Sequence, residues 1–179
     1  MPLVSCCASS RLLTKGKEIQ KFLDFLISLS TVSLLMQYTS SSRYALRALI
    51  HMAEAGTDRT HSLETICRDE KLPRAFINKI FKRLVDKKIL KSLKGPGGGY
   101  QFLKPPEQLT LYEIKVALDG EEDFTACALG LDHCSDQTPC SVHEFWKEIR
   151  VGFINAMQGT NLKKASELVA RKRAAGSAP

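Results

Sequence analysis

The 179-residue sequence predicts a mainly α fold: a winged helix-turn-helix with a two-stranded wing and a long C-terminal dimerisation helix. Two helical patterns separated by a short turn lie within residues 62–88, which is the arrangement of a helix-turn-helix. A glycine-rich segment between two short alternating stretches follows at residues 89–104 and is typical of a β-hairpin. Another helical pattern, at residues 141–157, carries so many large apolar side chains that it needs a surface to pack on.

The second helix of the predicted helix-turn-helix is amphipathic. Its apolar residues recur at the spacing of one helical face and comprise Phe76, Ile77, Ile80, Phe81, Leu84 and Val85. The surrounding sequence is basic, because residues 71–104 hold ten Lys or Arg and a single acid, Asp86. Pro73 suits the first helical turn, where no helical hydrogen bond needs its missing N–H. A short helix followed by a basic amphipathic one is the arrangement that places a recognition helix in the major groove of DNA.

The predicted wing surrounds the segment Gly95-Pro96-Gly97-Gly98-Gly99. Glycine permits tight turns and close approach to another backbone. We expect Arg74 and Asn78 to contact base edges, and Lys79, Lys82 and Lys94 to contact phosphates. The candidate DNA contacts of the wing are Gly97, Gly98 and Tyr100. A solvated basic helix beside an ordinary hairpin is the alternative interpretation, but the three features in this order favour double-stranded DNA as the partner.

Charge and motifs limit the possible functions. The formal net charge is +7, and residues 71–104 alone carry +9, so the rest of the chain is slightly acidic. A local basic footprint of this kind suits a polyanion. The sequence contains no nucleophile–base motif, no phosphate-binding loop before a helix and no paired-carboxylate signature. We therefore expect a binding protein, not an enzyme.

Residues 1–35 differ in character from the rest of the chain. Their apolar stretch, residues 22–35, is interrupted by Asp24 and is not followed by a small-residue cleavage motif, which disfavours a secretory signal. It is also too short and too rich in hydroxyl groups for a membrane span. We favour the interpretation that translation begins at Met36, and expect residues 1–35 to be disordered or loosely helical. A cytoplasmic protein without a membrane partner is therefore expected.

Two further helices complete the predicted domain. One runs from Tyr38 to Ala55 and ends at Gly56. The other follows Thr110, which forms a capping-box pattern with Glu113. The expected parts of the chain are an extension, the winged helix-turn-helix domain, a cysteine loop, a dimerisation helix and a frayed polar tail, at residues 1–35, 36–120, 121–141, 142–160 and 161–179.

The helix predicted at residues 141–157 has a broad apolar stripe. Its members are Phe145, Trp146, Ile149, Phe153, Ile154 and Met157. A second copy of the same helix in a twofold homodimer is the simplest partner, because helix-turn-helix proteins commonly read paired half-sites. The alternative is that the helix folds back on its own domain, and both can hold together.

The cysteine loop contains the candidate metal ligands Cys127, Cys134, Cys140 and His143. Thiolates are soft ligands that take iron–sulfur clusters, zinc or copper(I), and with an imidazole they fill four positions. Structural zinc more often uses closely spaced cysteine pairs, so these wider intervals favour a cluster. Reduced thiols without metal remain an alternative, and His133 is a rival fourth ligand. Cys67 falls on the buried face of a helix and is expected in the core.

From Met36 to about Gly159 the sequence resembles the IscR/NsrR/CymR family of bacterial winged-helix regulators. The matching segments are Ser42-Arg43-Tyr44-Ala45-Leu46, Leu72-Pro73-Arg74-Ala75-Phe76-Ile77-Asn78-Lys79-Ile80-Phe81, Gly95-Pro96-Gly97-Gly98-Gly99-Tyr100, Leu109-Thr110-Leu111 through Asp119-Gly120, and Cys140-x2-His143-x2-Trp146. The resemblance implies a dimeric transcription factor, usually a repressor, whose DNA affinity responds to an iron–sulfur cluster.

The resemblance also bears on cluster type. IscR-like members hold a 2Fe–2S cluster with three cysteines and one histidine, and the last two ligands match Cys140 and His143. NsrR-like members hold a 4Fe–4S cluster and use an aspartate of the N-terminal helix, whereas the comparable stretch here, residues 40–43, has no acid. CymR-like members respond to a protein partner or thiol oxidation, so a cluster-free or zinc-bound regulator is the alternative function. Departures from IscR are the x6 interval after Cys127, Lys94 in place of arginine, and Asn78 in place of glutamate.

Overall fold

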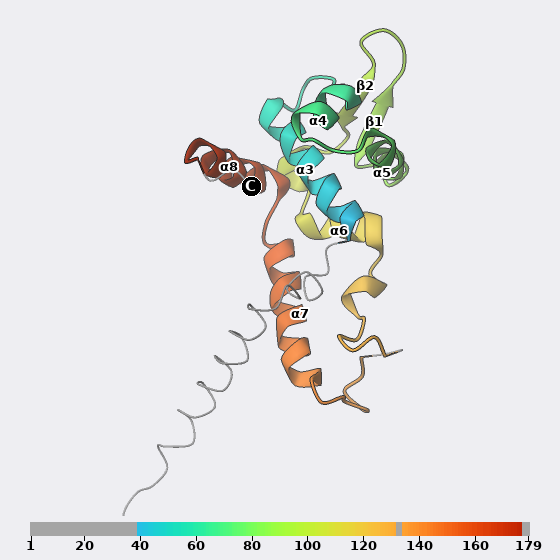
Figure 1. The fold of residues 1–179 in the computed structure, drawn as a ribbon, viewed down its shortest axis with the longest axis vertical. Coiled ribbons are helices and arrows are strands. Elements are labelled where there is room, and N and C mark those ends of the chain that lie inside the picture. Colours follow the sequence, from blue (N-terminus) through green and yellow to red (C-terminus); the bar gives the residue numbers. More distant parts are fainter. Residues whose placement is uncertain (1–38, 132–133, 177–179) are drawn as a thin grey trace, which may run out of the picture. The chain divides into compact units, whose positions relative to one another are not determined.

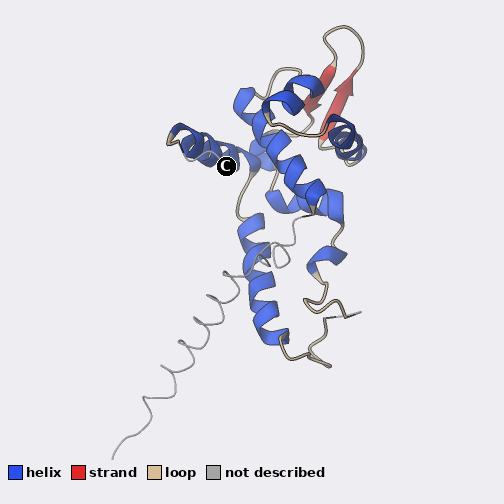
Figure 2. Cartoon of the chain, in the orientation of Figure 1, coloured by secondary structure: helices blue, strands red, loops and turns tan. Residues whose placement is uncertain are grey.

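The computed structural model describes residues 39–131 and 134–176 of the chain (Figure 1). The predictions made for residues 1–35 and for His133 lie outside the described residues. The helices and strands, in chain order, are α3 (Ser40–Ala55), α4 (Leu63–Asp69), α5 (Arg74–Asp86), β1 (Leu90–Leu93), β2 (Gly99–Phe102), the 3-10 turn η1 (Pro106–Gln108), α6 (Leu111–Asp119), the 3-10 turn η2 (Glu122–Phe124), α7 (His143–Gln158) and α8 (Leu162–Ala174). Figure 2 shows helices with one small sheet, so the mainly α prediction is confirmed.

The core lies among α3, α4, α5, α6 and the base of the wing. The apolar face of α5 enters it as its spacing predicts: Ile77, Ile80, Phe81 and Leu84 are buried, while Phe76 and Val85 are partly buried. The opposing side chains of α3 and α6 are fully enclosed and include Ala45, Leu49, Met52 and Ile114. Enclosing side chains of this size removes a large apolar area from water, which is the main stabilisation of the domain.

A tight turn joins α4 to α5. Lys71 adopts a left-handed conformation, with φ of 50°, and the amide of Leu72 donates to the carbonyl of Cys67 at 2.9 Å. Pro73 then caps α5 in an extended conformation. The predicted helix-turn-helix is therefore present. Leu72 is buried beneath the turn, which fixes the direction in which α5 leaves it.

The wing is an antiparallel pair in which Leu90 faces Phe102 and Leu93 faces Gly99. A third segment borders it, because His61 and Tyr100 exchange two backbone hydrogen bonds of 2.9 Å. A Cβ at Gly99 would lie 2.3 Å from the carbonyl oxygen of His61, so only glycine permits this approach. The glycine run predicted to form a turn thus also docks the wing against the helix-turn-helix.

Helix α6 begins with the predicted capping box. Thr110 Oγ1 accepts from the amide of Glu113 at 3.1 Å, and Glu113 Oε2 accepts from the amide of Thr110 at 2.9 Å. At its other end, Asp119 pairs with the fully buried Lys115 at 3.0 Å. The Asp119 carboxylate also accepts hydrogen bonds from Thr39 at 2.7 Å and from Ser42. The end of α6 is therefore fastened to the start of α3.

The last part of the chain differs from the prediction of a frayed polar tail at residues 161–179. Leu162–Ala174 form α8, which packs along α3 and buries Leu162 and Ala165. Asn161 caps it by accepting from the amide of Lys164 at 2.9 Å. Near its end, Arg173 bonds Glu54 and the buried Glu70, each at 2.8 Å. The apolar pattern of the sequence does not reveal α8, because the buried face of this helix is narrow and consists partly of small residues.

Candidate nucleic-acid interface and metal centre

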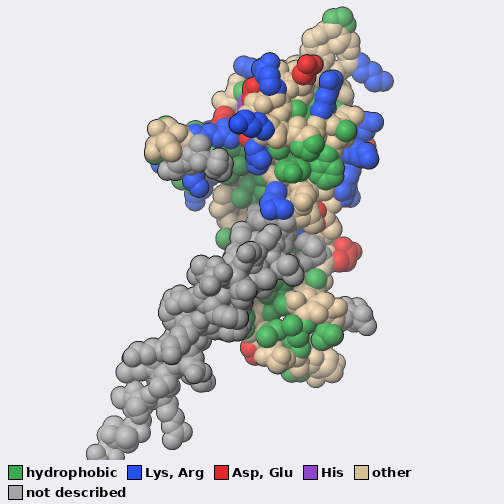
Figure 3. Space-filling view, viewed as in Figure 1, with side chains coloured by type: hydrophobic (Ala, Val, Ile, Leu, Met, Phe, Trp, Pro, Cys, Tyr) green, Lys and Arg blue, Asp and Glu red, His purple; other side chains and the backbone are tan. Residues whose placement is uncertain are grey.

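The outward face of α5 and the wing carry the candidate DNA contacts. Arg74, Lys79 and Lys82 are exposed on α5, and Lys94 is exposed on the wing. In Figure 3, Lys and Arg side chains gather over the part of the molecule that contains the winged helix-turn-helix. Arg83 is not among the candidate DNA contacts, because its guanidinium donates to the carbonyl of Leu118 at the end of α6. The exposed Lys and Arg side chains thus give this part of the molecule a cationic surface that could follow a phosphate backbone.

The start of α5 lines an open surface pocket. The pocket measures about 410 Å³ and is bordered by Leu63, Arg74, Ala75 and Asn78. The pocket thus combines the two candidate base-edge contacts, Arg74 and Asn78, with the apolar side chains of Leu63 and Ala75. Guanidinium and amide groups pair with base edges, and apolar groups contact the thymine methyl group, so this pocket has the chemistry of base recognition.

The wing and the recognition helix contact each other through Tyr100 and Asn78. The Tyr100 hydroxyl donates to Asn78 Oδ1 at 3.3 Å, and its ring meets Phe81 edge-on with centroids 4.8 Å apart. Burial raises the pKa of the Tyr100 hydroxyl, so it stays protonated and can act as a donor. Gly97 and Gly98 lie in the turn of the wing, where Gly97 has φ of 75°.

The loop after α6 is anchored to α7 by aromatic side chains. Phe124 stacks on Tyr112 of α6 with centroids 4.9 Å apart and contacts Phe153 of α7 at 6.4 Å. The indole N–H of buried Trp146 donates to the carbonyl of Ala126 at 2.9 Å. Cys127, the next residue, is 9% exposed. The first candidate ligand is therefore held against both α6 and α7.

The four candidate metal ligands meet as two pairs. Cys134 Sγ lies 3.4 Å from His143 Nδ1. The Cys140 side chain lies close enough to Cys127 to lower the pKa of its thiol. His143 is buried, 3% exposed, as the first residue of α7. The prediction that these residues act together stays a prediction, but residues 9 and 13 positions apart in the sequence do approach each other in these pairs.

The pKa of the Cys127 thiol lies below its ordinary value. The main cause is hydrogen bonding from the backbone N–H groups of Leu129 and Leu131, with a smaller contribution from Cys140, while burial opposes the shift. Backbone donors stabilise the thiolate, which is the form that binds metals and reacts with oxidants. The backbone of its own loop therefore favours the ionised form of the Cys127 thiol.

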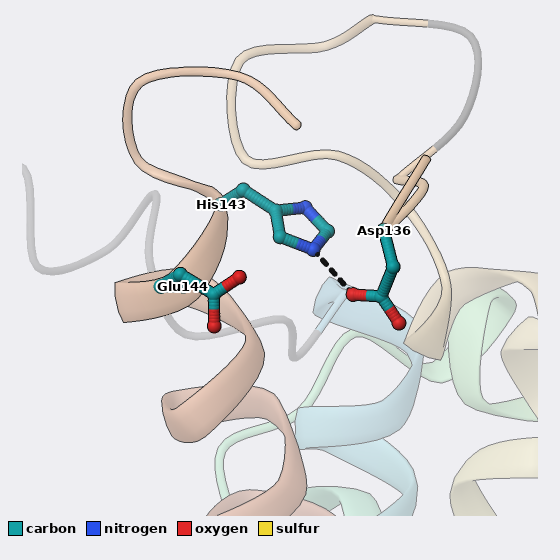
Figure 4. Close-up of side chains that lie close together, drawn as sticks. All are labelled: Asp136, His143 and Glu144. Carbon is teal, nitrogen blue, oxygen red and sulfur yellow. Dashed lines mark hydrogen bonds and ion pairs between the residues drawn. The ribbon is translucent and has the colours of Figure 1, made fainter. Parts of the chain in front are cut away.

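Asp136 is a polar residue of the site that sequence reasoning missed. Its Oδ1 lies 2.8 Å from His143 Nε2 (Figure 4). The same oxygen lies 2.7 Å from Lys147 Nζ. Lys147, then His143, lower the pKa of this carboxyl group to about 2. Asp136, His143 and Glu144 form a compact group of potential ligands among the described residues. The only sequence signal was that Lys147 follows His143 by one helical turn, so both can face one acid.

The apolar stripe of α7 is divided between two environments. Trp146 and Met157 are buried within the chain, and Phe153 contacts Phe124, so the helix folds back on its own domain in part. Ile149 remains 37% exposed, and Phe145 and Ile154 are half-buried. The remaining surface is apolar, and the homodimer stays a prediction.

Among the described residues, no helix combines the length and hydrophobicity that crossing a membrane requires.

Comparison with known proteins identifies the family. Residues 38–167 match the Rrf2 family, described as "Iron-dependent Transcriptional regulator". An HTH-type transcriptional regulator of Aquifex aeolicus (strain VF5) is 32% identical over 130 residues, which cover 72% of this chain and 90% of that protein. The HTH-type transcriptional regulator IscR of Photorhabdus laumondii is 26% identical over 137 residues, which cover 75% of this chain and 83% of that protein.

A solved structure supports the fold. The structure of CymR, the global cysteine regulator of B. subtilis, superposes with a TM-score of 0.63 at 21% identity and covers 73% of this chain and 96% of that one. The matched family and relatives are transcriptional regulators and not enzymes, in agreement with the sequence prediction. The extent of the family match and the identity to the Aquifex protein together show that the chain belongs to the Rrf2 family of transcriptional regulators.

Proposed function

We propose that the chain is a homodimeric transcriptional repressor whose operator affinity is controlled by a 2Fe–2S cluster bound by Cys127, Cys134, Cys140 and His143. The observation that carries the proposal is the approach of His143 Nδ1 to Cys134 Sγ at 3.4 Å. The influence of the Cys140 side chain on the pKa of Cys127 adds the other two candidate ligands. The family description, an iron-dependent transcriptional regulator, supports iron as the metal.

The donor set fits a two-iron cluster. Thiolates and imidazole both ligate iron–sulfur clusters, in which the four protein ligands are shared between two irons. Structural zinc more often uses closely spaced cysteine pairs, whereas the intervals between the ligands here are wider. The backbone N–H groups at Cys127 favour its thiolate and would stabilise a negatively charged centre. When bound, the cluster would supply a group whose charge and stability change with redox state and iron supply.

On the DNA side, α5 is the recognition helix in this proposal. Lys79, Lys82 and Lys94 contact phosphates, and Arg74 and Asn78 contact base edges in the major groove. Gly97 and Gly98 let the wing backbone approach the duplex closely. The basis is the exposed basic face together with the family membership.

In the homodimer, the exposed part of α7 around Ile149 packs against its counterpart in the second subunit. The paired subunits would then present two α5 helices to two half-sites. His143 begins α7, so the cluster would lie at one end of the dimer helix. Filling the site would fix that end and with it the spacing of the two recognition helices.

A physical connection between the two sites runs along α6, from Tyr112 to Leu118. Phe124 joins the cysteine loop to Tyr112 of α6, and the carbonyl of Leu118 accepts from Arg83 of α5. A displacement of the loop could therefore reach the recognition helix across one short helix. These contacts provide a route between the sites, and coupling is shown only if cluster binding changes operator affinity.

A second function has one observation in its favour. Cys127 has a lowered pKa and contacts Cys140, so this thiol pair is suited to oxidation. The alternative is thus a regulator of the same fold without a cluster, which responds to thiol oxidation, zinc or a protein partner.

The test is operator binding by the full chain, purified without oxygen, before and after removal of the cluster with a chelator. The operator is first selected from random duplexes. We expect removal to change affinity by about 5- to 150-fold, the range of ordinary allosteric coupling. Cys134→Ala should behave as the cluster-free protein in either condition, and Thr138→Ala, in the same loop, should behave as wild type. Equal affinity of both states, with a response to oxidant instead, would contradict cluster control.

A further inference from the structure

We infer that Asp136 is the positioning residue for His143: its carboxylate holds the Nε2–H group and so directs the Nδ1 lone pair toward the cluster site. This inference rests on the proposed function only for the identity of the metal group. In this role Asp136 itself does not ligate the metal group.

The tautomer follows from the two contacts of the ring. A neutral imidazole carries a proton on one nitrogen and a lone pair on the other. An ionised carboxylate only accepts hydrogen bonds, so the nitrogen 2.8 Å from Asp136 Oδ1 must be the one that carries the proton. Nδ1, 3.4 Å from Cys134 Sγ, then holds the lone pair.

Lys147 is the second partner of the Asp136 carboxylate. Its Nζ lies 2.7 Å from the same Oδ1 and is one helical turn after His143 on α7. The ammonium group and the His143 ring nitrogen thus converge on one carboxylate oxygen. Asp136 itself is 66% exposed, whereas His143 is 3% exposed. The exposed Asp136 carboxylate therefore holds the buried His143 ring from the side that faces solvent.

A hydrogen bond from the distal nitrogen to a carboxylate fixes the orientation of a ligating histidine and raises its basicity. Loss of such a partner typically lowers metal affinity by about 10- to 100-fold. Glu144 lies in the same compact group, yet Figure 4 joins only Asp136 to the ring. The neighbouring carboxylate thus provides a matched control.

The experiment compares Asp136→Ala with Glu144→Ala in the full chain, with two readouts. The first uses the metal-free protein with ¹⁵N-labelled histidine, at a pH where imidazole is neutral, and follows solvent exchange of the His143 Nε2 proton by NMR. The second loads iron and sulfide without oxygen and follows release of iron to a chelator. Far-UV circular dichroism verifies that both variants fold.

We expect a protected Nε2 proton in the wild type and in Glu144→Ala, and loss of that protection in Asp136→Ala. Iron release should accelerate by about 10- to 100-fold in Asp136→Ala alone. An Asp136→Ala protein with wild-type exchange and wild-type release would overturn the inference, as would equal effects of both substitutions. A wild type that shows the protected proton but takes up no iron would contradict the cluster and support the positioning of His143.

Discussion

The Tyr100 hydroxyl donates to Asn78 Oδ1, and this bond joins the wing to the recognition helix. Tyr100 is also tied to His61 by two backbone hydrogen bonds, and its ring packs on Phe81. The amide of Asn78 is thus oriented by a residue of the wing, and Asn78 borders the open pocket at the start of α5. In the proposed complex with DNA, the wing would therefore orient a residue that contacts a base edge.

Replacement of Asn78 by Ala should weaken operator binding and relax preference at one base pair, at a cost of about 1–3 kcal/mol. The reason is that an asparagine amide makes a base-specific contact in the major groove. Fluorescence anisotropy with the selected operator and its single-base variants measures both effects. Tyr100→Phe keeps the ring against Phe81 and removes only the hydroxyl, so it should relax the same base pair to a smaller degree. Unchanged preference in Asn78→Ala would exclude this residue from base readout.

Substitution of Ile149 by Glu should convert the proposed homodimer to monomers, because it places a charge in the apolar surface of α7. Sedimentation velocity provides the measurement. Val151→Glu is the matched control: Val151 is 48% exposed on α7 but lies two residues away, on another face of the helix. A stable Ile149→Glu dimer would show that subunits associate through a different surface.

Loss of the Arg173 side chain should destabilise the domain by about 1–2 kcal/mol, the usual value of a hydrogen bond to a charged partner less the effect of solvent screening. Arg173 fastens α8 to Glu54 and to the buried Glu70. The free energy of unfolding in urea, compared for Arg173→Ala and Arg171→Ala, isolates this contribution. Equal stability of the two variants would mean that α8 is held by its apolar face alone.

His61 should make the domain less stable in mild acid. Burial is the main cause of a pKa below the ordinary 6.5, although the hydrogen bond of Nε2 to the Gly56 carbonyl partly offsets it. Between the folded pKa and 6.5 the unfolded chain binds more protons, so stability falls as the pH decreases through this window. Urea unfolding of the metal-free protein at several pH values should show a shallower decline in His61→Gln. Parallel curves would contradict this assignment.

The fold could be predicted from sequence where one physical signal dominates. The stripe of Ile77, Phe81 and Leu84 required a helix with one buried face, and the glycine run required a turn. Thr110 with Glu113 marked a helix start, and the structure has it there. These signals are local, since each depends on residues within a few positions of one another.

The remaining features depend on contacts between distant residues. Helix α8 reads as a polar tail because Arg173 acquires its partners Glu54 and Glu70 only after folding. Asp136 lies in a loop, and its approach to His143 depends on the path of the chain between them. The intervals of the cysteines indicated a metal site, but the pairing of Cys134 with His143 was not contained in the spacing.

The central claim is that a two-iron cluster occupies the site formed by Cys127, Cys134, Cys140 and His143. The most direct measurement is the content of iron, acid-labile sulfide and zinc per subunit in the full chain purified without oxygen. The account predicts about two irons and two sulfides per subunit with no zinc, as a 2Fe–2S cluster requires, and loss of both in Cys134→Ala. A colourless protein that holds stoichiometric zinc and no sulfide would contradict it.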